Sequence, residues 1–147
     1  MTEAAAQLDG FPHDEMLTLL ARSAAGQIKT LAETMLPELG EITVHQNRTG
    51  LVMLPMRDTA KGTHFHLGEV LVSEARITAG GQEGYGMRRG RDLEAAMAMA
   101  VIDLAVALGR AHGAVIRFLI DQRDLQQAED RETLCRVEAT RVDMETF

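Results

Sequence analysis

The spacing of apolar residues predicts two short helices near the start of the chain. Residues 11–36 carry apolar side chains at intervals of three and four, which is the period of one helix face. Pro12 suits the first turn of a helix, whereas Ser23 and Gly26 interrupt the pattern. We therefore expect two helices in succession, ending before Pro37.

The middle of the chain changes to a period of two, which is typical of β-strands. Four segments show this alternation, at residues 41–48, 49–58, 64–78 and 82–90. Turn residues separate them at Thr49-Gly50, Lys61-Gly62 and Gly80-Gly81. Because the connections are short, we expect consecutive strands to pair as an antiparallel meander. Pro55 cannot donate a backbone hydrogen bond, so the second strand should be bulged there or lie at an edge.

A long apolar helix is predicted over residues 93–113, with Asp92 as its N-cap and Gly113 as its C-cap. A helix that is apolar nearly all round must be covered on more than one side. Beyond it, the pattern predicts an apolar run at 114–120, a charged, exposed helix at 121–139 and a short terminal strand at 140–147. The predicted fold is α+β, in a single domain spanning residues 1–147: paired N-terminal helices, a four-stranded antiparallel meander sheet, a long buried helix, a C-terminal helix and a short terminal strand.

Composition and charge then exclude several classes of function. The net charge is −7, and an acidic chain without a basic stripe is a poor candidate for nucleic-acid binding. The single cysteine, Cys135, excludes an internal disulfide, and we interpret it as a small core residue. The chain shows neither a signal-peptide pattern nor the ~18 uncharged apolar residues of a membrane span, so we expect a soluble, cytoplasmic protein.

Histidines and arginines supply the candidate chemical groups. His64 and His66 would share one face of a strand, and His45 on a neighbouring strand could complete a metal site. We favour the simpler interpretation, half-exposed histidines on a sheet surface, and predict no metal. The cluster of Arg88, Arg89 and Arg91 precedes a helix N-terminus, where guanidinium groups and free amides favour anions. This cluster is either a solvated strand end or a site for a nucleotide or phosphonate.

Gly68 and Glu69 interrupt an otherwise apolar strand. Strict alternation would place the Glu69 carboxylate on the same face as Leu71, among core residues, where it is costly unless paired. A β-bulge at Gly68 would shift the register, so that Val70 and Val72 face the core. We favour the bulge, which leaves Leu71 beside Glu69 on a surface that a partner could cover.

Four short motifs occur in order along the chain: Gly50-Leu51-Val52-Met53, Phe65-x-Leu67-Gly68-Glu69, Gly90-Arg91-Asp92 and Thr140-Arg141-Val142-Asp143. Together they resemble the G subunit family (PhnG) of the bacterial carbon–phosphorus lyase system. The resemblance extends from about Gly50 to Asp92 and resumes near Ala139.

This resemblance implies an accessory subunit of a cytoplasmic core complex. With a nucleosidase-like I subunit, such a complex joins an alkylphosphonate to ATP at the ribose C1′ and releases adenine, and a separate iron–sulfur subunit later breaks the carbon–phosphorus bond. The implied chain contributes no catalytic residue and binds no cofactor itself, although the complex uses ATP and phosphonate. Its main partner would be the I subunit, and it would self-associate when expressed alone. The candidate partner-binding residues are Phe65, Leu67, Gly68, Glu69, Leu71, Arg141 and Asp143.

Overall fold

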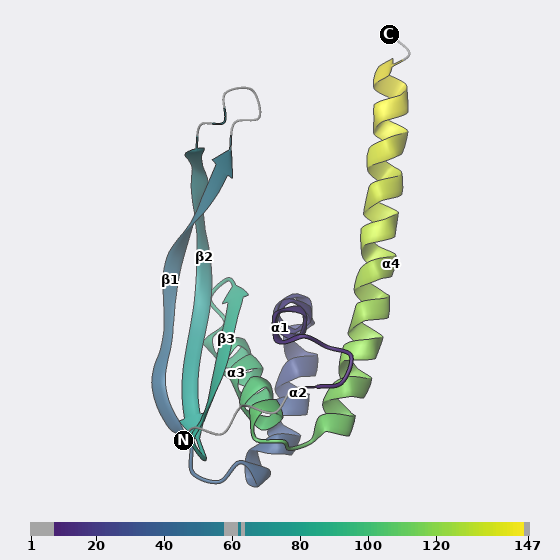
Figure 1. Cartoon of the computed structure of the whole chain (residues 1–147). Helices are drawn as coiled ribbons and strands as arrows, with labels where there is room; N and C mark the ends of the chain where they lie inside the picture. Colours follow the sequence, from purple (N-terminus) through teal and green to yellow (C-terminus); the bar gives the residue numbers. More distant parts are fainter. Residues whose placement is uncertain (1–7, 58–61, 63, 146–147) are drawn as a thin grey trace.

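The structure, a computed structural model, combines a three-stranded sheet with four α-helices (Figure 1). It describes residues 8–57, 62 and 64–145, with side chains placed for 8–53, 62 and 68–140. The elements are α1 (His13–Arg22), α2 (Ala25–Met35), a 3-10 turn η1 (Leu36–Glu38), β1 (Thr43–Arg57), β2 (His64–Ala79), β3 (Gln82–Arg89), α3 (Leu93–Ala107) and α4 (His112–Glu145). This confirms the predicted α+β class and the paired N-terminal helices.

Helix α3 is the centre of the molecule. It packs against β2 and β3 on one side and against α2 on the other. Helix α1 contacts both α3 and α4. Eleven of its residues are buried, because this helix offers apolar side chains in every direction. The carboxylate of Asp92 caps its N-terminus by accepting a hydrogen bond from the Ala95 amide at 3.0 Å. Both the buried helix and its N-cap are confirmed.

The described sheet has three strands, in the order β1-β2-β3, so the prediction of four strands was wrong. The first two predicted strands form one continuous strand, β1. Thr49 and Gly50 lie within it and pair with Ser73 and Val72 of β2. A Thr-Gly pair permits a turn but does not impose one, and the apolar residues that follow pair without interruption.

The bulge near Gly68 is present, but it does not change the buried face. Pairing skips Leu67, because Leu54 pairs with Gly68 and Pro55 with His66. From Gly68 onward the register is regular up to Arg76, so the residues that follow alternate as an unbroken strand.

The buried face of β2 is therefore the one that strict alternation from Glu69 gives. Ser73, Ala75 and Ile77 are fully buried under α3, so the favoured interpretation, with Val70 and Val72 on the core face, was wrong. Val72 is buried as well, although it lies on the other face. Glu69 lies beyond Val72, the last residue of β2 that pairs with β3, and is exposed. In Figure 1, this end of β2 extends past the helices.

The C-terminal part of the chain also differs from the prediction. Helix α4 continues through 34 residues to Glu145, which corresponds to about 51 Å. Thus Thr140–Glu145, predicted as a strand, are helical, and Gly113 lies in the first turn of α4. The alternation there is too short to outweigh the extension of an existing helix, in which each added residue contributes one more hydrogen bond.

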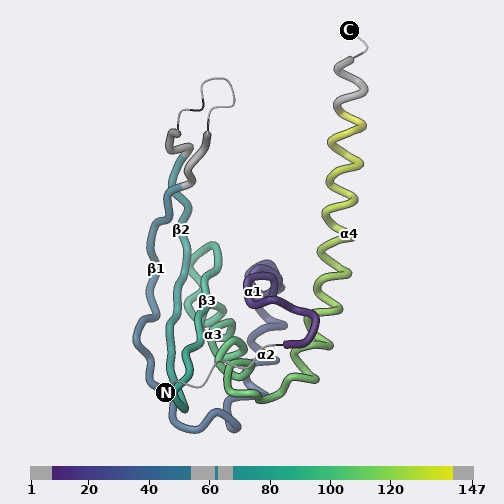
Figure 2. Tube along the Cα trace, viewed as in Figure 1, coloured from purple at the N-terminus to yellow at the C-terminus, as the bar shows by residue number. Residues whose placement is uncertain are grey.

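Two elements project beyond the compact part of the molecule. The β1–β2 hairpin continues past the end of β3, and α4 continues past α1, both toward the top of the view (Figure 2). We call the part of the β1–β2 hairpin beyond β3 the β arm, and the part of α4 beyond α1 the helical arm.

Candidate interaction surfaces

The stretch that contains Gly68 and Glu69 lies on the β arm. Both residues are exposed, and Leu71 is half-buried. Phe65 and Leu67 belong to β2, but their side chains lie outside the described ones. The contacts predicted for those two residues therefore stay predictions.

Three apolar residues of β1 extend this surface, and the sequence interpretation missed them. Leu51 is 63% exposed, Val52 39% and Met53 54%. Leu51 pairs with Leu71, and Met53 pairs with Glu69. We call this group of six, Leu51, Val52, Met53, Gly68, Glu69 and Leu71, the hairpin patch. By alternation, Val52 and Gly68 lie on the opposite face of the two strands from the other four. Its sequence signal was an eight-residue run without charge, Thr49 to Met56, in a strand.

The distal part of α4 is the second exposed surface. All residues from 127 to 140 are exposed, including Leu134 at 58% and Val137 at 57%. Cys135 lies here and is exposed, so its interpretation as a core residue was wrong. Arg141 and Asp143 belong to the last turns of α4, with side chains outside the described ones. Their contacts with a partner also stay predictions.

The three arginines do not converge on one point. Arg88 donates to the carbonyl oxygens of Leu20 at 2.5 Å and Ser23 at 2.7 Å, at the end of α1. Burial lowers the pKa of this guanidinium, against the opposing effect of Asp92. Arg89 lies on the opposite face of β3 and is exposed, as is Arg91. The guanidinium of Arg88 is therefore engaged by the end of α1. Of the three arginines, only Arg89 and Arg91 remain available to bind an anion.

The N-terminus of α3 already has an anionic partner. Asp92 caps it and also accepts a hydrogen bond from Lys29 Nζ at 2.9 Å. That hydrogen bond, followed by the one from the Ala95 amide, lowers the pKa of the Asp92 carboxyl. The positive end of the helix is thus neutralised within the chain.

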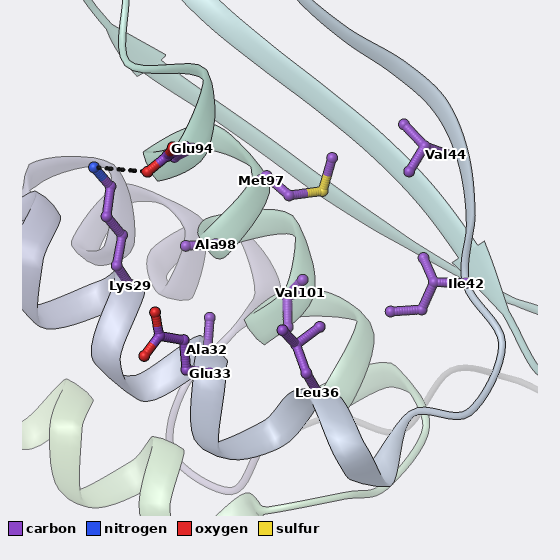
Figure 3. Close-up of a pocket in the computed structure, with 10 residues that line it drawn as sticks. All are labelled: Lys29, Ala32, Glu33, Leu36, Ile42, Val44, Glu94, Met97, Ala98 and Val101. Atoms are coloured by element: carbon purple, nitrogen blue, oxygen red, sulfur yellow. Dashed lines mark ion pairs between the residues drawn. The ribbon is translucent and has the colours of Figure 1, made fainter.

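An apolar groove opens between α2, α3 and the start of β1 (Figure 3). Its volume is about 390 Å³, at the small end of the ~300–1,000 Å³ typical of ligand sites. Charged residues, Lys29, Glu33 and Glu94, flank it on the helix side. Lys29 lies 3.8 Å from Glu94. The lining residues are Lys29, Ala32, Glu33, Leu36, Ile42, Val44, Glu94, Met97, Ala98 and Val101.

The histidines are dispersed in the described part of the chain. His45 is exposed, with its Nε2 2.8 Å from the Thr78 hydroxyl. The side chains of His64 and His66 lie outside the described ones. Among the described residues, no group of three or more His, Cys, Asp or Glu residues is arranged to hold a metal ion. None of the helices over these residues is long and apolar enough to cross a membrane.

The chain as a whole is similar to known proteins. Residues 12–147 match the family model described as "Phosphonate metabolism protein PhnG". The chain is also 35% identical, over 136 residues, to the alpha-D-ribose 1-methylphosphonate 5-triphosphate synthase subunit PhnG of Rhizobium meliloti (strain 1021). That alignment covers 90% of this chain and 86% of the relative.

Proposed function

Because this chain belongs to the PhnG family of phosphonate metabolism proteins, we propose that it is an accessory subunit of an alpha-D-ribose 1-methylphosphonate 5-triphosphate synthase complex. The proposed complex transfers the ribosyl triphosphate of ATP to an alkylphosphonate and releases adenine. In this proposal the chain shapes the assembly in the cytoplasm, and ATP and phosphonate bind to the complex rather than to this subunit by itself.

The distal part of α4 is the observation that carries this proposal. Residues 127–140 are all exposed and include Leu134 and Val137. A helix gains most of its stability from packing an apolar face rather than from propensity. A helical arm without such packing is therefore best explained by a partner chain that supplies the missing face.

The buried polar groups support a non-catalytic role. Asp103 accepts a hydrogen bond from the Tyr85 amide at 2.8 Å, and its pKa is raised chiefly by burial. Arg88 holds the end of α1. Shifted pKa values mark functional sites only where the groups face a cleft and a substrate, whereas these two join elements of the fold.

Co-purification with the I subunit, the partner we propose, tests this function. We expect the tagged chain to elute with the I subunit as one defined heteromer, with its mass measured by light scattering during size exclusion. The control is the tagged chain expressed by itself, which should self-associate through the exposed apolar side chains of α4 and the hairpin patch. A monomer that leaves the I subunit unbound would contradict the proposal.

Binding of a nucleotide or phosphonate at the arginines is the alternative. It would now depend on Arg89 and Arg91, since Arg88 is engaged and Asp92 occupies the nearby helix N-terminus. A pocket of about 610 Å³ beside Arg22, Arg88 and Arg89 could admit an anion. Arg22 is paired with Asp130, however, and Arg88 with the end of α1, so this alternative stays a prediction of the sequence.

A further inference from the structure

We propose that the outer edge of β1 and the groove beside it accept an extended strand from another subunit of the complex, with apolar side chains toward the groove and a basic residue near Glu33. This inference rests on the function proposed above. It adds the mode of contact: strand addition to an open sheet edge.

The direction of the backbone groups of β2 follows from one hydrogen bond. The carbonyl oxygen of Leu71 accepts from the Gly90 amide at 2.9 Å, just beyond the end of β3. The backbone amide and carbonyl of Leu71 therefore point toward the β3 side. Backbone groups alternate along a strand. The backbone amide and carbonyl of Val72 therefore point toward β1, where the residue paired with Val72 is Gly50.

The same alternation determines which groups of β1 are open. Gly50 exchanges hydrogen bonds with Val72, so its neighbours Thr49 and Leu51 direct their amides and carbonyls away from β2. The register is regular from Gln46 to Leu54, so Asn47 and Met53 do the same. These four residues, Asn47, Thr49, Leu51 and Met53, are the open edge.

The opposite edge of the sheet is protected, which makes the contrast informative. On β3, the outward-pointing Tyr85 amide donates to the buried Asp103 carboxylate of α3 at 2.8 Å. Helix α1 also contacts β3. In the described part of the chain, no strand lies on the outer side of β1.

Between Asn47 and Met53 the open edge has little of the usual protection against pairing, because the register shifts of β1 and Pro55 lie outside this stretch. Isolated edge strands are kept short or carry charges, prolines or bulges. Here β1 has 15 residues, and its only Lys, Arg, Asp or Glu between Thr43 and Met53 is Arg48. Arg48 lies 3.8 Å from Glu74 of β2. An exposed edge of this kind is expected only where another chain covers it.

The groove lies beside this edge on the same side of the sheet. Val44 lines the groove, is 54% exposed and pairs with the buried Ile77, so it lies on the face that α3 covers. Figure 3 shows Val44 and Ile42 forming the strand wall opposite Met97 and Val101. A strand added outside β1 would place every second side chain on the face that α3 covers. Those side chains that lie opposite Val44 would reach the mouth of the groove.

The charges around the groove indicate the chemistry of the incoming strand. Lys29 already donates to Asp92 at 2.9 Å. Glu33 has no ion-pair or hydrogen-bond partner within the described residues, and Glu94 is 87% exposed. The rim is therefore acidic overall, and a lysine or arginine beside the apolar positions of the incoming strand would complement it.

Amide hydrogen exchange tests the inference on the full chain, free and in complex with the co-expressed I subunit. We expect assembly to slow exchange of the Thr49 and Leu51 amides by about tenfold or more, as a new hydrogen bond of ordinary strength requires. The Gly50 and Val52 amides, which already pair with β2, serve as internal controls and should be slow in both states.

The other outcomes are distinguishable. A complex that forms without slowing Thr49 and Leu51 would overturn the strand addition and leave the proposed function standing. Failure to form any complex would overturn both. Protection in the free chain at twice its monomer mass would mean that the occupant is a second copy, which also overturns the partner strand.

A pair of variants separates the backbone from the side chain. Leu51→Pro removes one outward amide and leaves the pairing with β2 intact, as proline is tolerated on an edge. Leu51→Ala removes the side chain and keeps the amide. We expect Leu51→Pro to reduce co-purification about tenfold relative to Leu51→Ala. Equal recovery, with normal circular dichroism of both variants, would contradict the inference. Thr49→Pro repeats the test should Leu51→Pro misfold.

Discussion

At the scale of single residues, Asp103 shows how a charged side chain is accommodated in an apolar helix. Its carboxylate accepts from the Tyr85 amide and lies 2.8 Å from His13 Nε2. The residue is only 4% exposed, so a charge there must be paired to be tolerated. The carboxylate thus links α3 to the outer edge of β3 and to the first turn of α1.

Asp103→Asn should change how stability depends on pH. Burial raises the pKa of Asp103 in the folded chain, so the native state binds this proton more readily than the unfolded state does. The contribution of Asp103 to the free energy of unfolding should therefore fall as the pH rises from about 4 through the raised pKa. Asn does not titrate. Urea unfolding of both proteins at a series of pH values should therefore show that the free energy of unfolding of the wild type falls relative to that of the variant across this window.

Asp92 and Asp130 cannot produce that difference. The pKa of Asp92 is lowered, mainly by Lys29, and that of Asp130 is lowered, mainly by Arg22. Lowered carboxyl pKa values make the free energy of unfolding rise with pH, which is the opposite direction. Both shifts are also common to wild type and variant. A difference in unfolding free energy that stays constant with pH would contradict the assignment.

At the scale of elements, the contact between α3 and β3 depends on two small residues. An added Cβ at Gly84 would clash with the Ala100 carbonyl, and one at Gly86 with the Ala96 carbonyl. Helix and strand therefore approach more closely than any side chain would allow. The sequence shows these glycines, but a close approach cannot be recognised until the partner helix is known.

Gly84→Ala should lower the free energy of unfolding by about 1–3 kcal/mol or more, since backbone atoms would have to move apart. Gly50→Ala is the matched control, because it also lies in a strand but a Cβ there meets nothing within 4 Å. That control should stay within about 1 kcal/mol of wild type. Chemical denaturation followed by circular dichroism measures both, and similar losses would contradict the close packing.

Prediction of the elements succeeded where periodicity was long and failed where it was brief. The two N-terminal helices and the buried helix α3 follow from three-to-four spacing and the Asp92 cap. The errors lay at Thr49-Gly50, where a permitted turn does not form, and at Thr140–Glu145, where a short alternation is helical. In both places the outcome depends on the secondary structure of the preceding residues. A strand that is already paired continues to pair, and a helix that has already formed is extended at little cost.

At the scale of the whole molecule, the two arms predict that folding and assembly can be separated. A truncation after Asp130 removes the exposed part of α4 and keeps the ion pair between Asp130 and Arg22. We expect its melting temperature to stay within about 4 °C of wild type, because surface residues contribute little to stability. Co-purification with the I subunit should fall sharply.

The same truncation distinguishes the two arms. A shortened chain that still assembles fully would show that the distal part of α4 is not an interface, and would leave the hairpin patch as the candidate contact. A shortened chain that no longer folds would contradict the view that the described residues 131–140 contribute little to the core.

The sequence by itself determined the α+β class, the Asp92 cap and the apolar helix, because these follow from local periodicity and from side chains near in sequence. It also carried the motifs of the PhnG family. Only the tertiary structure decided which residues are left uncovered. The hairpin patch and the open edge of β1 arise because β1 and β2 extend past the helices that cover their lower part (Figure 1), and the arginines separate because adjacent residues of β3 point to opposite faces. Exposure depends on what lies opposite a residue in space, and that is set by packing between distant segments.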